Sequence, residues 1–276
     1  MSDLAAPASA PGSHRPPDPG SDPEPRTLSL LGVPVEDLTL PQALTTLEAL
    51  LSGPAGACHP IFFVNAHTLN LAFEDPDYRA VLGSAHRVFG DGTGVRWAAR
   101  ILHGVRLRDN VNGTDLVPAL FAAFRDRGFR YYLLGASADA IERAADHARQ
   151  AFPGWELVGH HHGYLDDETS PPVIEAINAA RPHLLLVGMG NPKQERWLAK
   201  HRDRLDVRVG MGTGGLFDYW AGDLDRAPAW VRRLGSEWVH LLLRQPRKLR
   251  RYLVGNPLFL WRLVRARWLG GPDGRG

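Results

Sequence analysis

Short apolar segments alternate with longer, helix-like segments along the chain from residue 27 onward. This alternation is typical of an α/β domain, in which largely parallel strands form a sheet and helices cover its faces. We expect strands at 27–35, 60–65, 86–90, 130–135, 156–161, 183–188 and 207–212, and helices at 40–51, 75–85, 94–102, 113–128, 137–152, 171–180 and 191–205. The predicted fold is α/β with a Rossmann-like, doubly wound, mostly parallel sheet.

Both ends of the chain differ from this domain in composition. Residues 1–26 are rich in Pro, Ser, Gly and Asp, carry few large apolar side chains, and lack the apolar run of a secretory signal. From residue 226 to 276, twelve Arg or Lys residues stand against two acidic residues, although the whole chain has a net charge of only +2. We therefore expect a disordered leader at 1–26, an α/β domain at 27–225, a basic amphipathic helical appendage at 226–270 and a flexible tail at 271–276.

The chain has a single cysteine, Cys58, so it can form no internal disulfide, and no cluster of Cys and His residues surrounds this position. No uninterrupted apolar stretch reaches the roughly 18 residues that a membrane-spanning helix needs. These two features predict a protein of the cytoplasm.

Five of the expected strands end in Gly or Asn and continue at once into polar turns: "VNAHT", "FGDGTG", "LLGASAD", "VGMGNPKQE" and "VGMGTGGLFD". In a parallel sheet such turns gather at the carboxyl edge, where helix N-termini offer free N–H groups to anions. Turn geometry alone explains any single glycine, but it explains five successive strand ends less well. The first functional hypothesis is a ligand that carries phosphate.

The turn "GDGTGVRWAAR" places Asp91 between two glycines, so its carboxylate projects from a flexible backbone. A carboxylate in this position can accept the proton of a hydroxyl and act as a general base. Alternatively, Asp91 or Thr93 is only the N-cap of the following helix. Local sequence leaves both interpretations open.

The stretch "MGNPKQERW" combines groups that suit a sugar phosphate. Pro192 is expected at the first helical position, with Gln194 and Glu195 in the first turn. Lys193 offers a charge for a phosphate, and Gln194 can both donate to and accept from a sugar hydroxyl. The alternative is a well-capped surface helix with Trp197 in the core.

Three consecutive histidines, at 160–162, suggest a metal site at first sight. Consecutive strand residues point to opposite faces, so the three imidazoles cannot converge on one ion. A strand end with solvated imidazoles is the favoured interpretation, and no metal site is expected.

The C-terminal segment interleaves arginines with aromatic residues, and each of three prolines is expected to begin a short helix. Residues 256–271 are too few to span a bilayer but suit a helix that lies among lipid headgroups. Nucleic-acid binding has a similar footprint, and a solvated charged face over the core is a third interpretation.

Several longer pieces of the chain resemble the WecB/TagA/CpsF glycosyltransferases (glycosyltransferase family 26). They occur in the family's order over nearly all of residues 27–265, and they are "VNAHTLNLAFEDPDYRAVLGSAHRVFGDGTGVRWAAR", "VNGTDLVPAL", "YYLLGA", "PHLLLVGMGNPKQERW", "VGMGTGGLFDYWAG" and "RAPAWVRRLGSEWVHLLLRQPRKLRRY".

This resemblance implies transfer of an N-acetylmannosamine-type or related hexose from a UDP-sugar to a polyprenyl-diphosphate-linked sugar, without an essential metal or other cofactor. Members act in the synthesis of cell-surface polymers such as teichoic acid and exopolysaccharide. By position, Asp91 matches the family's proposed catalytic base, Gln194 its active-site Gln, and Asn65 its first-strand Asn. Phe63 stands where some members have Thr, so that role is absent here or taken by a neighbour such as Thr68 or His67.

A metal-free site must supply positive potential to the departing UDP from helix N-termini, backbone N–H groups, Lys or Arg. The catalytic, nucleotide-sugar-binding domain is then residues 27–225, with Asp91 and Gln194 as catalytic residues. The expected substrate-binding residues are Asn65, Gly92, Gly94, Asn112, Gly113, Gly135, Gly188, Gly190, Pro192, Lys193, Glu195, Gly212, Gly214, Gly215 and Asp218. Four arginines are expected to hold the acceptor's diphosphate: Arg226, Arg244, Arg247 and Arg251.

A lipid-linked acceptor makes membrane-surface association the favoured interpretation of the basic segment. The protein is expected in the cytoplasm at the inner face of the cell membrane, with no nucleic-acid partner, and an exposed apolar face on that segment is compatible with a homo-oligomer. Deleting residues 226–276 is expected to spare nucleotide binding and to abolish transfer.

Two other functions stay open at this point. A Rossmann-like dehydrogenase or methyltransferase would bind NAD or S-adenosylmethionine, although no GxGxxG directly follows the first strand. A nucleotide-sensing or nucleic-acid-binding module would use the same turns and the basic segment without turnover.

Overall fold

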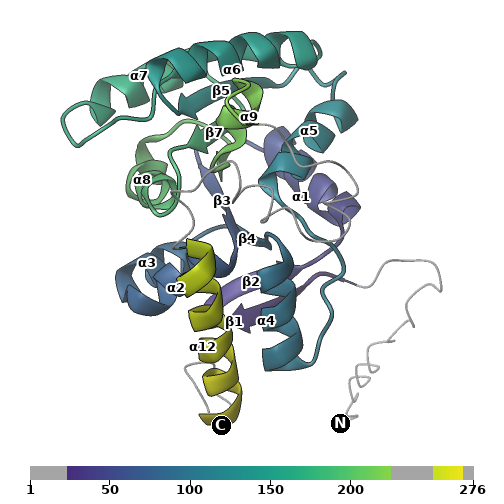
Figure 1. The fold of residues 1–276 in the computed structure, drawn as a ribbon. Helices are drawn as coiled ribbons and strands as arrows, with labels where there is room; N and C mark the ends of the chain where they lie inside the picture. Colours follow the sequence, from purple (N-terminus) through teal and green to yellow (C-terminus); the bar gives the residue numbers. More distant parts are fainter. Residues whose placement is uncertain (1–23, 225–250, 270–276) are drawn as a thin grey trace, which may run out of the picture.

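The computed structural model describes residues 24–224 and 251–269 of the chain. Within these residues, eight strands form one sheet in the order β1-β2-β4-β3-β8-β7-β5-β6. β1 and β2 pair antiparallel, and every other neighbouring pair is parallel. Helices cover both faces of the sheet (Figure 1). The predicted α/β, doubly wound and mostly parallel fold is confirmed.

The strands follow the apolar segments of the sequence, with one difference. Residues 27–35, expected as one strand, belong to a hairpin, because Leu31 and Gly32 take φ angles of 53° and 82° and reverse the chain in a two-residue turn. The strands are β1 Arg26–Leu30, β2 Val33–Asp37, β3 His59–Val64, β4 Arg87–Gly90, β5 Arg130–Gly135, β6 Glu156–His161, β7 Leu184–Gly188 and β8 Val209–Gly212.

The helices include two that the sequence did not predict, α2 and α9. Asp75 separates α2 from α3, because it ends the first helix and its side chain accepts the N–H of Tyr78 to begin the second. The helices are α1 Leu40–Ser52, α2 Ala66–Glu74, α3 Pro76–Gly83, α4 Thr93–His103, α5 Gly113–Ala123, α6 Ala138–Ala151, α7 Ser170–Ala180, α8 Lys193–His201, α9 Leu216–Trp220 and α12 Asn256–Leu269. Two helices are shorter than expected: α5 was predicted at 113–128 and α8 at 191–205. After α8 the chain continues as a 3₁₀ turn, Arg202–Arg204.

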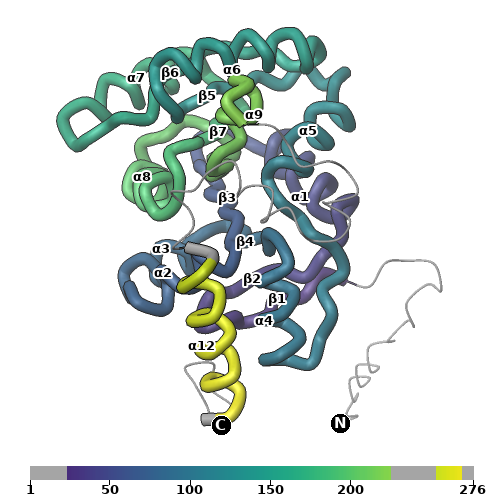
Figure 2. Tube along the Cα trace, in the orientation of Figure 1, coloured from purple at the N-terminus to yellow at the C-terminus, as the bar shows by residue number. Residues whose placement is uncertain are grey.

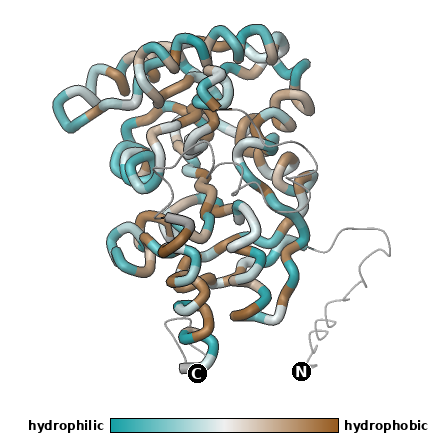
Figure 3. The backbone as a smooth tube through the Cα atoms, viewed as in Figure 1, coloured by the Kyte–Doolittle hydropathy of each residue, from teal (hydrophilic) through white to brown (hydrophobic). Residues whose placement is uncertain are grey.

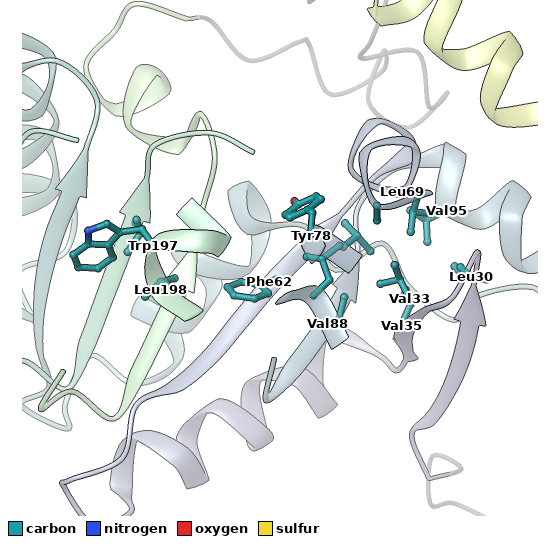
Figure 4. Close-up of a cluster of buried hydrophobic side chains, with 14 of the residues drawn as sticks. Leu30, Val33, Val35, Phe62, Leu69, Tyr78, Val88, Val95, Trp197 and Leu198 are labelled. Carbon is teal, nitrogen blue, oxygen red and sulfur yellow. The ribbon is translucent and has the colours of Figure 1, made fainter. Parts of the chain in front are cut away.

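Two apolar cores lie on opposite faces of the sheet. Along β7, Leu185 and Val187 enter the core beneath α7 and α8, while Leu184 and Leu186 enter the core beneath α5 and α6. Because these strands are buried on both faces, their sequences are nearly uninterrupted apolar runs. Figure 4 shows part of the first core, and Figure 3 shows hydrophobic residues concentrated on the strands and on the inner sides of the helices.

The C-terminal helix α12 is packed into the first core. It follows a π-helical turn, Arg251–Gly255, and lies against α2 and α4 at the same end of the sheet as the β1–β2 hairpin (Figure 2). Phe259 is 1% exposed and Leu263 is fully buried. The described end of the expected appendage is thus helical, but it forms part of the globular body.

A hydrogen-bonded contact fastens α12 to α2. The guanidinium of Arg262, itself 7% exposed, donates through Nη1 to the backbone O and side-chain Oδ1 of Asn70, at 3.1 and 2.9 Å. Its Nη2 donates to Glu74 Oε1 at 2.5 Å. In return, Asn70 Nδ2 donates to the backbone O of Gly255 at 2.8 Å. None of the helices in the two described ranges is long and apolar enough to cross a membrane.

Candidate active site

The carboxyl ends of the parallel strands place most of the predicted site residues along one edge of the sheet. Asn65 follows β3 and Asp91 follows β4, and these strands are neighbours. Gly135, Gly188 and Gly212 end the consecutive strands β5, β7 and β8. From this edge α6 and α8 leave toward opposite faces, the arrangement at which sheets of this type bind ligands.

Asp91 lies in the loop between β4 and α4 and is half-buried. Its N–H donates to the backbone O of Val64 at 2.8 Å, which joins the ends of β4 and β3. The N-cap of α4 is Gly92, with no side-chain capping bond, and the Gly92 N–H donates to Asn110 Oδ1 at 2.5 Å. The N-cap position of α4 is therefore held by Gly92 and not by Asp91 or Thr93, and Thr93 is the first residue of the helix.

Gly94 lets this loop approach the loop after β3. A Cβ at Gly94 would lie 2.8 Å from the Cβ of Ala66, closer than side chains pack. Because Ala66 directly follows Asn65, the contact holds the Asp91 loop beside Asn65.

Asn65 is the N-cap of α2. Its Oδ1 accepts the N–H groups of His67 and Thr68, at 3.0 and 3.2 Å, and the hydroxyl of Thr68 at 3.3 Å. Phe63, two residues before Asn65, is a buried strand residue. A Cβ added to Gly113 would lie 3.2 Å from the ring of Phe63, so this phenylalanine supports the start of α5.

The remaining turn residues begin helices at the same edge. Asn112 caps α5, since its Oδ1 accepts the N–H of Asp115 at 2.9 Å. Gly113 is the first residue of α5, and Gly215 is the N-cap of α9, which contains Asp218. The backbone O of Asp218 accepts the N–H groups of Asp223 and Leu224.

The turn after β7 differs from the expectation in one respect. Pro192 is the N-cap of α8 and not its first residue, and the exposed Lys193 begins the helix. Gln194 is 1% exposed and Glu195 is fully buried, so α8 is not a simple surface helix, although Trp197 is a core residue as expected.

The side chain of Gln194 points inward. Its Oε1 accepts the N–H groups of Gly190 and Gly214, at 3.2 and 3.0 Å, and its Nε2 donates to Glu195 Oε1 at 2.7 Å. Glu195 also accepts Asn191 Nδ2 at 2.6 Å and the hydroxyl of Tyr78 at 3.1 Å. Burial raises the pKa of Glu195 above its usual range.

The sequence did not point to Tyr78 or Asn191. Tyr78 precedes Glu195 by 117 residues, and only the packing of α3 against α8 brings the two together. Burial, and then the charge of Glu195, raises the pKa of the Tyr78 hydroxyl, so it stays a donor at physiological pH.

The predicted contacts to a lipid diphosphate are not placed by the structure. Arg226, Arg244 and Arg247 lie outside the described residues, and Arg251 begins the π-helical turn with no description of its side chain.

Of the histidines at 160–162, His160 points away toward Glu142, while the rings of His161 and His162 lie against each other with centroids 4.2 Å apart. His160 Nε2 lies 2.9 Å from Glu142 Oε2, while His161 Nδ1 lies 2.9 Å from the backbone O of His162. In the part of the chain that the structure describes, no three side chains of His, Cys, Asp or Glu are grouped as metal ligands.

A cavity of about 600 Å³ lies at the opposite, amino edge of the sheet and contains none of the predicted site residues. Its walls include Cys58 and the paired rings of His59 and His86, whose centroids are 4.4 Å apart. Burial raises the pKa of Cys58 to about 12, which suits an unreactive packing residue.

Comparison with known proteins agrees with the geometry. The model of the family described as "Glycosyl transferase WecG/TagA/CpsF family" matches residues 28–272. Two relatives, from Staphylococcus aureus strains MW2 and NCTC 8325 / PS 47, are each named N-acetylglucosaminyldiphosphoundecaprenol N-acetyl-beta-D-mannosaminyltransferase. Each is 29% identical to this chain over 242 residues, which cover 87% of this chain and 93% of the relative.

Proposed function

The chain belongs to the WecG/TagA/CpsF family of glycosyl transferases, and from this premise we propose that it transfers an N-acetylmannosamine-type or related hexose from a UDP-sugar to a polyprenyl-diphosphate-linked sugar. Membership of this glycosyltransferase family excludes both alternatives that the sequence left open, the dehydrogenase or methyltransferase and the binding module without turnover. The relatives are named for an acceptor in which N-acetylglucosamine is linked through a diphosphate to undecaprenol, and we propose an acceptor of that class here. The product would enter a cell-surface polymer.

The observation that carries the proposal is the position of Asp91. It lies at the carboxyl edge, beside Asn65 and within the row of glycine turns, and the N-cap position of α4 belongs to the next residue, Gly92. In the proposed reaction its carboxylate takes the proton of the acceptor hydroxyl as the hydroxyl oxygen attacks the anomeric carbon. The bond from that carbon to the UDP oxygen breaks, and UDP leaves with the electron pair.

We propose that this departure needs no metal ion. Lys193 and the N-termini of α4 and α8 face the same edge, where they can stabilise the negative charge that develops on UDP. The arginines at 226, 244, 247 and 251 are proposed to hold the acceptor's diphosphate.

The function is tested by incubating the full chain with UDP-sugars and a short-chain polyprenyl-diphosphate N-acetylglucosamine. We expect release of UDP and a disaccharide product only when donor and acceptor are both present, in buffer with or without EDTA. A requirement for added Mg²⁺ would contradict the metal-free step. The absence of product with every UDP-sugar, together with thermal stabilisation by NAD or S-adenosylmethionine but not by UDP, would contradict the function itself.

The outer side of α12 supports the proposal that the protein docks on the inner face of the cell membrane. Trp261, Val264 and Trp268 are spaced to share one side of the helix, and they are 54%, 48% and 82% exposed. The guanidinium of Arg265 lies 5.3 Å from the centre of the Trp261 ring. Exposed tryptophans beside arginines suit the headgroup region of an anionic membrane.

Replacing both tryptophans, Trp261→Glu and Trp268→Glu, is expected to weaken binding to vesicles that contain anionic lipid by at least about tenfold, because two aromatic rings no longer enter the interface. Co-sedimentation with phosphatidylglycerol vesicles measures the change. The matched control is Tyr164→Glu, which alters an aromatic residue that is 73% exposed on the loop after β6. Equal loss in the control would show that added charge alone, and not the face of α12, governs binding.

A further inference from the structure

The carboxamide of Gln194 joins two turns of the proposed donor site. Its single oxygen accepts both the N–H of Gly190, which follows β7, and the N–H of Gly214, which follows β8. The two glycines are half-buried, whereas Gln194 is 1% exposed. One side-chain atom thus sets the separation of the two turns.

Glu195 determines which end of that carboxamide faces the turns. Both oxygens of Glu195 accept hydrogen bonds from neighbouring side chains, and the NH₂ end of Gln194 donates to Oε1 at 2.7 Å. The oxygen of the carboxamide is then left to face the N–H groups of Gly190 and Gly214, which can only donate. If the amide were rotated by 180°, donors would face donors and an acceptor would face the carboxylate.

The remaining partners of Glu195 keep its carboxylate in one place. Asn191 Nδ2 and the Tyr78 hydroxyl complete a set of three donors together with Gln194, and all three are neutral. A fully buried carboxylate among neutral donors is costly, because desolvation is not offset by an opposite charge. An apolar residue in its place would leave the donors of Gln194, Asn191 and Tyr78 without an acceptor, so the carboxyl group is what holds these side chains in their positions.

We propose that Glu195 is a positioning residue for sugar transfer, which holds the Gln194 carboxamide so that its oxygen sets the spacing of the Gly188–Gly190 and Gly212–Gly215 turns around the donor's diphosphate. This inference rests on the proposed function. In it, Gln194 acts on the backbone of the site and not on a sugar hydroxyl.

Three variants test the direction of the hydrogen bonds between Gln194, Glu195 and the two turns. Glu195→Gln replaces one accepting oxygen of the cluster by an NH₂ group, and Gln194→Glu places two buried carboxyl groups in contact, so both single variants disturb the arrangement. The double variant, Gln194→Glu with Glu195→Gln, restores a carboxylate oxygen facing the two turn amides and an NH₂ group between the two side chains. Asn191 can accept the reversed polarity by rotating its own amide. The matched control is Glu175→Gln, the same chemical change on the exposed side of α7.

Two measurements are made on each full-length variant. Amide exchange, followed by NMR on protein labelled with ¹⁵N-glycine and ¹⁵N-leucine, is expected to be at least about tenfold faster at Gly190 and Gly214 in both single variants, with Leu185 and Leu186 of β7 unchanged. The KM for the donor is expected to rise about tenfold or more in the single variants with little change in the KM for the acceptor, since a small displacement at a site is amplified in binding and rate. The double variant is expected to recover most of the original exchange rates and of the original KM for the donor. The control, Glu175→Gln, is expected to change neither quantity.

The proposal is overturned if Glu195→Gln leaves both glycine amides at their original exchange rates, or if the double variant is no better than the worse single variant. Equal acceleration at Leu185 and Leu186 would also overturn it, because the residue would then stabilise the fold in general. If the unmodified protein transfers no sugar, the proposed function fails, while the exchange rates still decide whether Glu195 positions the two turns.

Discussion

Replacing Asp91 by Asn is expected to lower kcat by about 10²–10⁴-fold while the Kd for UDP changes less than about threefold. Asn has nearly the same shape as Asp but cannot take a proton from the acceptor hydroxyl. The backbone contact from the Asp91 N–H to Val64 is unaffected by the change, and the N-cap position of α4 belongs to the next residue, Gly92. The loss should therefore appear in the chemical step and not in the fold of the loop.

Steady-state transfer and calorimetric titration with UDP measure the two quantities. The control is Asp203→Asn, which changes a side chain that is 90% exposed at the amino edge of the sheet. The control should keep its full kcat. An Asp91→Asn variant that keeps more than about a tenth of the original kcat would mean that another group takes the proton.

Much of the frame of this site could be predicted from the sequence. The strands at 60–65 and 183–188 are nearly uninterrupted apolar runs, because helices cover both faces of the sheet, and their ends place the glycine turns at one edge. The position of Asp91 follows from the same rule. The N-cap of α4 could not be predicted in this way, since Asp is itself a favoured cap and only the backbone geometry shows that Gly92 takes that position.

The elements that the sequence did not predict carry local signals that have more than one interpretation. The hairpin at residues 31 and 32 uses a Leu in a left-handed conformation, where Asn or Gly is the ordinary choice. The helix α2 begins directly after β3 with Asn65 as its cap, so the polar stretch after the strand was interpreted as a turn. Residue propensity alone does not decide between a turn and a longer element in either case, because tertiary packing decides the conformation.

The pair Gln194 and Glu195 shows a different limit. The sequence placed both residues correctly in the first turn of a helix at the site edge. It did not show that both are buried, because their partners come from Tyr78 in α3 and from the turn after β8. Contacts of such long separation depend on the packing of α3, α8 and β8, which no local pattern encodes.

The C-terminal helix α12 carries a buried arginine on its inner side, which the charge count of the segment does not reveal. In α12, Arg262 lies between the buried Phe259 and Leu263 and faces inward to Asn70. The excess of Arg and Lys over acidic residues at 226–276 predicts an appendage, and this count does not distinguish the inward-facing Arg262 from the outward-facing Arg265. Deleting residues 226–276 would remove Phe259 and Leu263 from the core, so that deletion does not separate acceptor binding from stability.

Replacing Leu263 by Ala is expected to lower the free energy of unfolding by about 2–4 kcal/mol, because a fully buried leucine in the core shared with α2 and α4 leaves a cavity. The midpoint of thermal unfolding should fall by roughly 5–10 °C for a chain of this size. Circular dichroism during heating and in urea measures the change. The control is the neighbouring Val264→Ala, which shortens a side chain that is 48% exposed and should change the free energy by less than about 0.5 kcal/mol. Equal, small effects of the two substitutions would mean that α12 is detached from the domain in solution, and the exposed tryptophans on its outer side would then have no fixed orientation relative to the active site.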